Sequence, residues 1–147
     1  MPYKIIVVGT DGSGRAGAAV DEALALAKAY GAALHAVTVV DPRVAAGFAD
    51  SRSAQLDVNE RMDQVNQVQR SVTAAAQRQG VAVELHNPGN TDPADGLLEV
   101  AVNVGADLVV VGNRGMSGMK RFVLGSVPNK VSHNCPCSVL IVNTETD

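Results

Sequence analysis

The chain has 147 residues, a length that suits one domain (1–147) able to bury a continuous core. Hydrophobic residues make up 46% of it but aromatic residues only 3%, which predicts a core of aliphatic side chains, as in helices packed on a parallel sheet. The net charge of −3 and the few aromatic rings argue against a nucleic-acid partner, and no stretch reaches the ~20 apolar residues of a membrane span.

The first strand is predicted over residues 5–8, where consecutive β-branched side chains indicate burial on both faces. The glycine-rich segment 9–13 then predicts a turn into a helix, which Gly31 ends. This first apolar run is too short for a signal peptide and stops at Asp11, so a cytoplasmic location is expected.

A second strand is predicted over 34–40, followed by a loop over 43–53 that carries Phe48 and is interpreted as a lid. A long helix over 55–79 follows and is closed by Gly80, and its apolar stripe favours packing on a sheet over a coiled coil. The stripe consists of Val58, Met62, Val65, Val72 and Ala76.

The second half of the chain continues the same alternation. A strand over 81–86 alternates as edge strands do. Asp92 and Pro93 predict the start of a helix, because aspartate caps first-turn amides and proline fits the first helical position. That helix has a stripe of Leu97, Leu98, Ala101 and Val104 and ends at Gly105. The last three predicted elements are a strand over 107–111, a helix over 126–133 and a strand over 138–142.

Five strands separated by helices predict a three-layer α/β fold, an open parallel five-stranded sheet with helices on both faces. Ligands of such folds bind beyond the carboxyl ends of the strands, where the winding reverses. The glycine-rich loops 9–14 and 112–118 both follow strands. They would face each other across one crevice if the first and fourth strands are neighbours.

The glycines of the second loop indicate a phosphate site. Gly112 and Gly115 are followed by Gly125 and Ser126, and glycines let backbone amides approach a phosphate while Ser126 can open a helix that attracts anions. No carboxylate lies between Asp107 and Glu145, whereas four basic residues do: Arg114, Lys120, Arg121 and Lys130. The alternative is a basic loop solvated at the surface.

Other site classes find little support. The glycine spacings match neither a Walker A loop nor a dinucleotide fingerprint. Cys135 and Cys137 are predicted to be small buried hydrophobes, and a metal site formed with His133 is the alternative. The three histidines look scattered along the chain, and none has an evident nucleophile partner.

The sequence Val7-Val8-Gly9-Thr10-Asp11-Gly12-Ser13, with Gly112-x2-Gly115-x9-Gly125-Ser126-Val127 and Pro136 before the last strand, resembles the universal stress protein family over essentially the whole chain. The second motif is similar to that of the subgroup that binds ATP. The resemblance implies an adenine-nucleotide α-hydrolase-like sheet in the order 3-2-1-4-5. It also implies a homodimer formed through the last strand, Ser138 to Val142.

The resemblance implies that Asp11 meets the adenosine, that Val39 lies against the adenine, and that the remaining residues line the ribose and phosphates. The nucleotide-binding set is Thr10, Asp11, Val39, Val111, Gly112, Arg114, Gly115, Gly125, Ser126 and Val127. The implied function is that of an ATP-binding stress-response regulator, with Mg²⁺ or Mn²⁺ as a possible companion of the phosphates and an unknown regulatory partner. The alternatives are cyclic AMP or AMP as ligand, slow ATP hydrolysis or autophosphorylation at Ser126 or another nearby hydroxyl, and a dimeric interaction module that holds no nucleotide.

Overall fold

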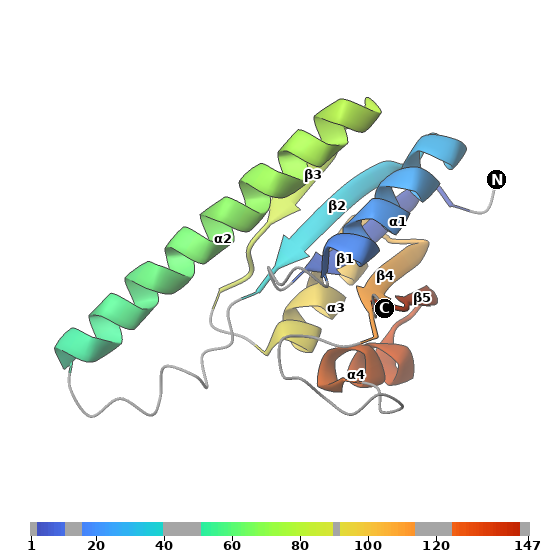
Figure 1. Ribbon diagram of the computed structural model, residues 1–147. Helices are drawn as coiled ribbons and strands as arrows, with labels where there is room; N and C mark the ends of the chain where they lie inside the picture. The colour runs from blue at the N-terminus through green and yellow to red at the C-terminus, as the bar shows by residue number, and fades with distance from the viewer. Residues whose placement is uncertain (1–2, 11–15, 40–50, 90–91, 114–124, 145–147) are drawn as a thin grey trace.

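The computed structural model describes residues 3–10, 16–39, 51–89, 92–113 and 125–144. Within these ranges it describes the backbone but not the side chains of Ala16, Gln64 and residues 51–61. Nine elements follow one another in these ranges (Figure 1). They are β1 (Ile5–Thr10), α1 (Ala16–Tyr30), β2 (Ala33–Thr38), α2 (Ser51–Gln79), β3 (Val83–His86), α3 (Pro93–Val104), β4 (Leu108–Gly112), α4 (Ser126–Asn134) and β5 (Ser138–Val142). None of the helices in the described part of the chain is long and apolar enough to cross a membrane.

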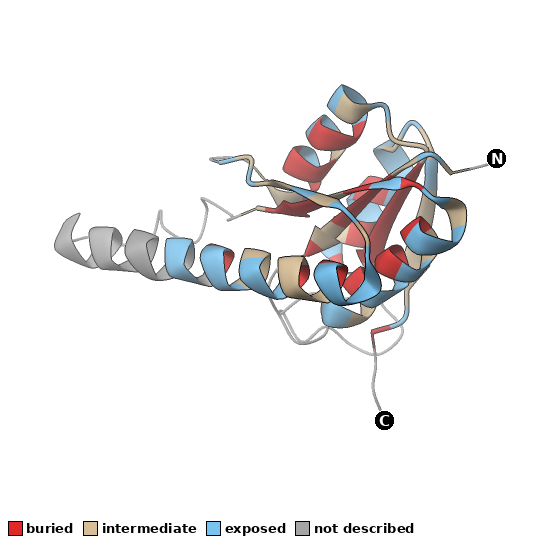
Figure 2. Cartoon of the chain, turned by 90° about the horizontal axis from the view of Figure 1, so that it is seen from above, coloured by how far each residue is buried: buried red, intermediate tan, exposed pale blue. Residues whose placement is uncertain are grey.

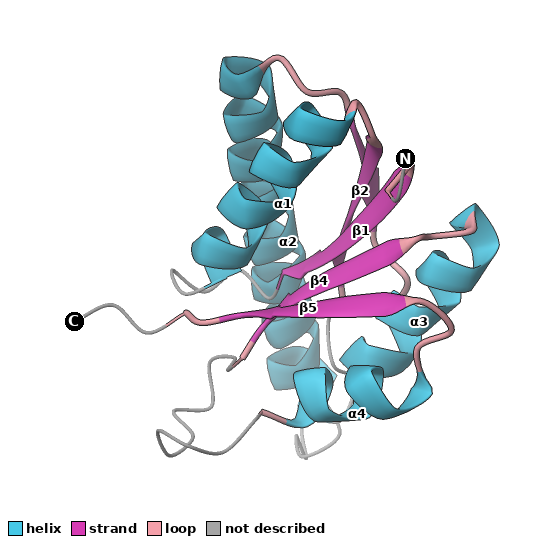
Figure 3. Ribbon diagram, turned by 90° about the vertical axis from the view of Figure 1, so that its right-hand side faces the viewer, coloured by secondary structure: helices cyan, strands magenta, loops and turns pink. Residues whose placement is uncertain are grey.

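The five strands form one parallel sheet in the order β3-β2-β1-β4-β5, as predicted. Helices α1 and α2 cover one face, and α3 and α4 cover the other (Figure 3). β1 lies at the centre and pairs with β4 through Val7 and Val109. The winding therefore reverses between β1 and β4, which is where the predicted crevice requires it.

Two apolar clusters, one on each face of the sheet, form the core. Alternate residues of β1 point to opposite faces, so Ile6 and Val8 join the cluster under α1 and α2 while Val7 joins the one under α3 and α4. Each of these three side chains is fully buried. Burial on both faces explains why the central strands read as unbroken aliphatic runs.

Three of the helix-to-strand turns contain a glycine in the left-handed conformation. Gly31, Gly80 and Gly105 follow α1, α2 and α3, and each has a φ of +64° to +71°, a left-handed conformation that glycine adopts without strain. Gly105 also donates its N–H to carbonyls of the last turn of α3. All three helix ends were predicted from these glycines.

The start of α3 is capped as predicted. The side chain of Asp92 accepts a hydrogen bond from the amide of Asp95 at 3.4 Å, and Pro93 occupies the first turn. Within the stripe, Leu97 and Ala101 are buried, and Leu98 and Val104 pack against the same cluster. Val100, which the stripe omitted, is also buried.

Several strand boundaries differ from the sequence-based prediction by one or two residues. β1 continues through Gly9 and Thr10, which were predicted to lie in the turn, while β2 ends at Thr38 rather than at residue 40. A Cβ on Gly9 would come within 3.0 Å of Leu97 Cδ2, so this glycine allows α3 to approach the strand rather than forming a turn. β3 begins at Val83 and lies at the edge of the sheet, as its alternation predicted.

α2 begins at Ser51, so residues 51–53 are helical and not part of the predicted loop. Residues 40–50, which include Phe48 and the interpreted lid, lie outside the described residues. The helix runs beyond the sheet (Figure 1), and in its C-terminal half one side is buried against the body (Figure 2). Val65, Val72 and Ala76 are buried there as predicted, whereas Met62 is 43% exposed because it precedes the part of α2 that packs on the sheet.

Candidate functional site

The candidate site lies at the carboxyl edge of the sheet, where β1, β2 and β4 end. Thr10 is the last residue of β1 and stands opposite Thr38 of β2. Val111 and Gly112 end β4, the other neighbour of β1. Thr10 and Val111 are buried, and Val39, one residue beyond β2, is partly buried in the cluster under α3. The structure therefore brings four of the predicted residues to one edge.

The two halves of the second glycine motif meet at this edge. The amide of Gly125 donates a hydrogen bond to the carbonyl oxygen of Asn113 at 2.9 Å. Gly125 is the N-cap of α4, and Ser126 is its first residue. The hydrogen bond thus holds the first turn of α4 against the end of β4, although eleven residues separate its two partners in sequence.

The first turn of α4 can receive an anion. Gly125 makes no side-chain capping bond, so no side chain of the N-cap residue competes for the first amides. Ser126 is exposed and Val127 is partly buried. Pro128 is buried and brings no N–H, so the amides of Ser126 and Val127 are the ones available to an anion in this turn.

Asn113 is a site residue that the sequence analysis missed. Its side-chain oxygen accepts hydrogen bonds from the amide of Thr144 at 3.0 Å and from the hydroxyl of Thr144 at 2.8 Å. Its own amide donates to the carbonyl of Val142 at 2.9 Å. Asn113 therefore joins the end of β4 to α4 and to the exit of β5. The signal in the sequence was a lone amide side chain directly after a buried strand and within the glycine motif.

The charge of Lys130 is not directed at the site alone. Its Nζ lies 2.7 Å from a carboxylate oxygen of Asp95 and 3.4 Å from one of Asp92, at the start of α3. The hydrogen bond to Asp95 raises the pKa of Lys130. The count of basic residues between Asp107 and Glu145 therefore overstates the charge that Lys130 brings to the site, because the carboxylates that oppose it come from the start of a different helix.

Several predicted residues lie outside the described ranges. These are Asp11, Arg114 and Gly115 of the nucleotide-binding set and Lys120 and Arg121 of the basic cluster. Their roles stay predictions.

The cysteines are free, and their sulfur atoms lie 3.5 Å apart. Cys135 and Cys137 pack against the cluster under α3 and α4, as predicted for small hydrophobes, but they are only partly buried. Burial, followed by the hydrogen bond with Cys135, raises the pKa of Cys137 to about 12. Among the described residues, His133 forms no metal-ligand group with them.

Two of the histidines are not scattered. Nδ1 of His35 lies 2.9 Å from Nε2 of His86, and Glu84 lies beside them. The analysis of the sequence missed this cluster because its members come from β2 and β3, about fifty residues apart.

The comparisons with known proteins agree with this geometry. The model of the universal stress protein family matches residues 2–143. The chain belongs to this family. It is 33% identical to a universal stress protein of Methanocaldococcus jannaschii over 95% of this chain and 82% of that protein.

Two solved structures are informative neighbours. One is a universal stress protein in complex with cyclic AMP, with 33% identity, a TM-score of 0.74 and coverage of 99% of this chain and 100% of that one. The other is the universal stress protein of Archaeoglobus fulgidus in complex with dAMP, with 24% identity, a TM-score of 0.66 and coverage of 96% and 98%. At that identity the second neighbour supports the fold alone.

Proposed function

We propose that this universal stress protein binds ATP at the carboxyl edge of β1 and β4 and acts as a cytoplasmic stress-response regulator. The observation that carries the proposal is the hydrogen bond from the Gly125 amide to the Asn113 carbonyl, because it sets the first turn of α4 beside the end of β4. A helix N-terminus in this position favours a phosphate through its amides and its dipole. The cyclic AMP complex of a 33% identical neighbour supports an adenine nucleotide as the ligand.

In this proposal the adenine lies near Val39 and the phosphates near α4. Val39 packs in an apolar cluster at the end of β2, which suits the flat face of a purine. Ser126 is exposed at the start of α4, which suits a hydroxyl that donates to a phosphate oxygen. Asp11, Arg114 and Gly115 complete the set on the strength of the family motif, and Mg²⁺ or Mn²⁺ is a possible companion of the phosphates.

Cyclic AMP is the second candidate ligand, because a neighbour with 33% identity and nearly full coverage was solved in complex with it. Calorimetric titrations with ATP, with and without Mg²⁺, and with cyclic AMP and AMP separate the candidates. Tightest binding of ATP supports the proposal, and tightest binding of cyclic AMP favours the second candidate. No heat with any adenine nucleotide at millimolar concentration contradicts both.

Two variants with matched controls locate the site. Each of Ser126→Ala and Arg114→Ala removes one hydrogen bond to a charged phosphate, worth about 1.5–3 kcal/mol, and should weaken ATP binding roughly 10- to 150-fold. Ser132→Ala, on an exposed position near the other end of α4, and Arg78→Ala, near the end of α2, should bind as the unaltered protein does. Equal binding by a site variant and its control would remove that residue from the site.

We further propose a homodimer formed through β5. Within the described residues β5 pairs with β4 and with no other strand, and its side chains from Val139 to Val142 are only partly buried. Val142 directs its carbonyl to β4, so the backbone groups of Ile141 face the outer edge, where a second copy could pair. Light scattering should show a dimer that Ile141→Pro converts to a folded monomer, since proline removes an outward N–H without breaking the pairing with β4. A protein that is monomeric at high concentration would contradict this interface.

We propose that nucleotide occupancy changes the conformation or the partner choice of this dimer. Hydrogen exchange with and without ATP is the test. Altered protection at the ends of β4 and α4, reaching β5 through Asn113, is expected.

A further inference from the structure

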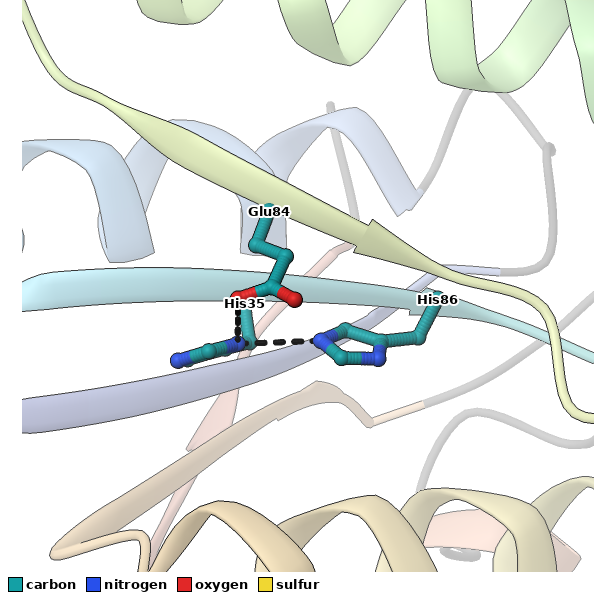
Figure 4. Close-up of side chains that lie close together, drawn as sticks. All are labelled: His35, Glu84 and His86. Carbon is teal, nitrogen blue, oxygen red and sulfur yellow. Dashed lines mark hydrogen bonds and ion pairs between the residues drawn. The ribbon is translucent and has the colours of Figure 1, made fainter.

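A cluster of three potential metal ligands lies on β2 and β3, away from α4. Glu84 and His86 are two residues apart on β3, so they share one face of the sheet. In the register of the sheet His35 stands opposite Glu84, and Val37 stands opposite His86. Figure 4 shows the three side chains directed toward one another from β2 and β3. Val37, which shares the face of His35 on β2, packs in the cluster under α3 and α4. The neighbours Leu34 and Leu85 pack on the opposite face, under α1 and α2.

The distances between the donor atoms are those of ligands around one small ion. His35 Nδ1 lies 2.9 Å from His86 Nε2 and 3.4 Å from Glu84 Oε2, and one ligand atom of each residue lies within 4.8 Å of the others. With Zn–N and Zn–O bonds of about 2.0–2.2 Å, two ligand atoms on one zinc ion are roughly 3–3.5 Å apart. Side-chain adjustments of about an ångström in Glu84 and His86 would therefore complete a common coordination sphere.

The surroundings favour metal entry from the sheet edge. The His35 side chain is 11% exposed, which fixes its ring, whereas the Glu84 side chain is 68% exposed and can swing toward an incoming ion. β3 is the edge strand, so no further strand of the described sheet covers this side. Burial is the main cause that lowers the pKa of His35, with the charge of His86 acting in the same direction and that of Glu84 opposing it. The neutral ring is the form that ligates metals.

We propose that His35, Glu84 and His86 form a binding site for a zinc-type transition-metal ion. Two imidazole nitrogens and one carboxylate are a donor set that zinc accepts, while the hard ions Mg²⁺ and Ca²⁺ select oxygen donors. On binding, the hydrogen bond between Nδ1 of His35 and Nε2 of His86 is replaced by two bonds to the metal. The proton shared by the two rings moves to the outer nitrogen of one of them, so each ring offers a lone pair. Three protein ligands leave a coordination position for water.

The competing interpretation is a hydrogen-bonded histidine pair with a surface carboxylate beside it. The two interpretations differ in what added metal does. The full-length protein, stripped with a chelator and free of nucleotide, is titrated with Zn²⁺ by calorimetry and with Co²⁺ by visible absorption. One ion per chain and tetrahedral-type Co²⁺ bands are expected. Because nucleotide is absent, the outcome is independent of the ATP proposal.

Matched variants identify the ligands. His86→Gln should weaken Zn²⁺ binding more than roughly 100-fold, because losing a ligand costs more than losing one of its outer hydrogen-bond partners. Glu84→Gln should also weaken it. The controls are His133→Gln, at an exposed histidine on α4, and Glu99→Gln, at an exposed glutamate on α3, and both should retain full affinity.

Imidazole ¹⁵N spectra of the unaltered protein give a readout that does not depend on whether a variant folds. Zn²⁺ should shift the resonances of His35 Nδ1 and His86 Nε2 and leave those of His133 unchanged. The proposal is overturned if the unaltered protein binds no stoichiometric Zn²⁺ or Co²⁺, if His86→Gln binds as tightly as the unaltered protein, or if the His133 resonances are the ones that move.

Discussion

Replacing Asn113 by alanine should destabilise the protein through Thr144. The side-chain oxygen of Asn113 accepts two hydrogen bonds from Thr144, whose exposed fraction is 2%, so water cannot easily replace the lost acceptor. At about 0.5–1.5 kcal/mol for each neutral hydrogen bond, the expected loss is roughly 1–3 kcal/mol. For a domain of this size a loss of about 2 kcal/mol lowers the melting temperature by roughly 4–8 °C.

Urea denaturation followed by circular dichroism measures this loss. Asn113→Asp keeps both acceptor bonds and loses only the 3.5 Å contact with Asn143, so it should retain most of the stability. Thr144→Val removes the hydroxyl alone, and a double-mutant cycle with Asn113→Ala should give a coupling of about 0.5–1.5 kcal/mol. The reasoning is refuted if Asn113→Ala lies within about 0.5 kcal/mol of the unaltered protein, or if Asn113→Asp is equally destabilised.

Three further predictions follow from contacts elsewhere in the fold. Gly9→Ala should cost about 1–3 kcal/mol by overpacking against Leu97, and this cost should shrink in a Leu97→Ala background; denaturation curves showing equal costs would contradict the contact. Backbone amides lower the pKa of Asp107, so its ionised carboxylate stabilises the folded state above about pH 4, and this contribution is lost as the pH falls through the lowered pKa. Asp107→Asn should therefore lower the urea midpoint at neutral pH and differ less from the unaltered protein at about pH 2–3, and a difference that stays constant with pH would exclude the charge as its cause. Because its pKa is raised to about 12, little of Cys137 is thiolate, the reactive form, at pH 8. A thiolate of higher pKa is also more nucleophilic, which offsets part of this loss, so Cys137 should be alkylated roughly 30- to 60-fold more slowly than in the urea-unfolded chain. Peptide mass spectrometry measures the two rates, and equal rates would contradict the burial of Cys137.

The order and type of the elements were predictable because their signals are local. Aliphatic runs marked β1 and β4, and glycines marked the ends of three helices at the residues where the left-handed turns occur. The resemblance supplied the strand order, which periodicity alone does not contain.

The errors arose where a segment distant in sequence determines the role of a residue. In the sequence Gly9 indicates a turn, and only the approach of Leu97 from α3 shows why a glycine is needed inside the strand. Lys130 looked unopposed because its acidic partners lie 35 and 38 residues earlier in the chain.

The same limit applies to the clusters of polar side chains. The alternation of β3 put Glu84 and His86 on one face, but the sheet register was needed to place His35 opposite Glu84. At the candidate site, the motif predicted that Gly112 and Gly125 belong together. It did not predict that Asn113 holds them there, because the bond to Thr144 depends on where β5 ends.

The three left-handed glycines that close α1, α2 and α3 have a consequence for protein engineering. They all stand at the amino edge of the sheet, the edge remote from Thr10 and Gly112. Each turn there is short and defined by its own hydrogen bonds, so that edge is a scaffold whose geometry does not depend on what the opposite loops contain. Ligand specificity could thus be redesigned by exchanging the loops at the carboxyl edge of the sheet, while the turns at the amino edge keep the helices and strands in place.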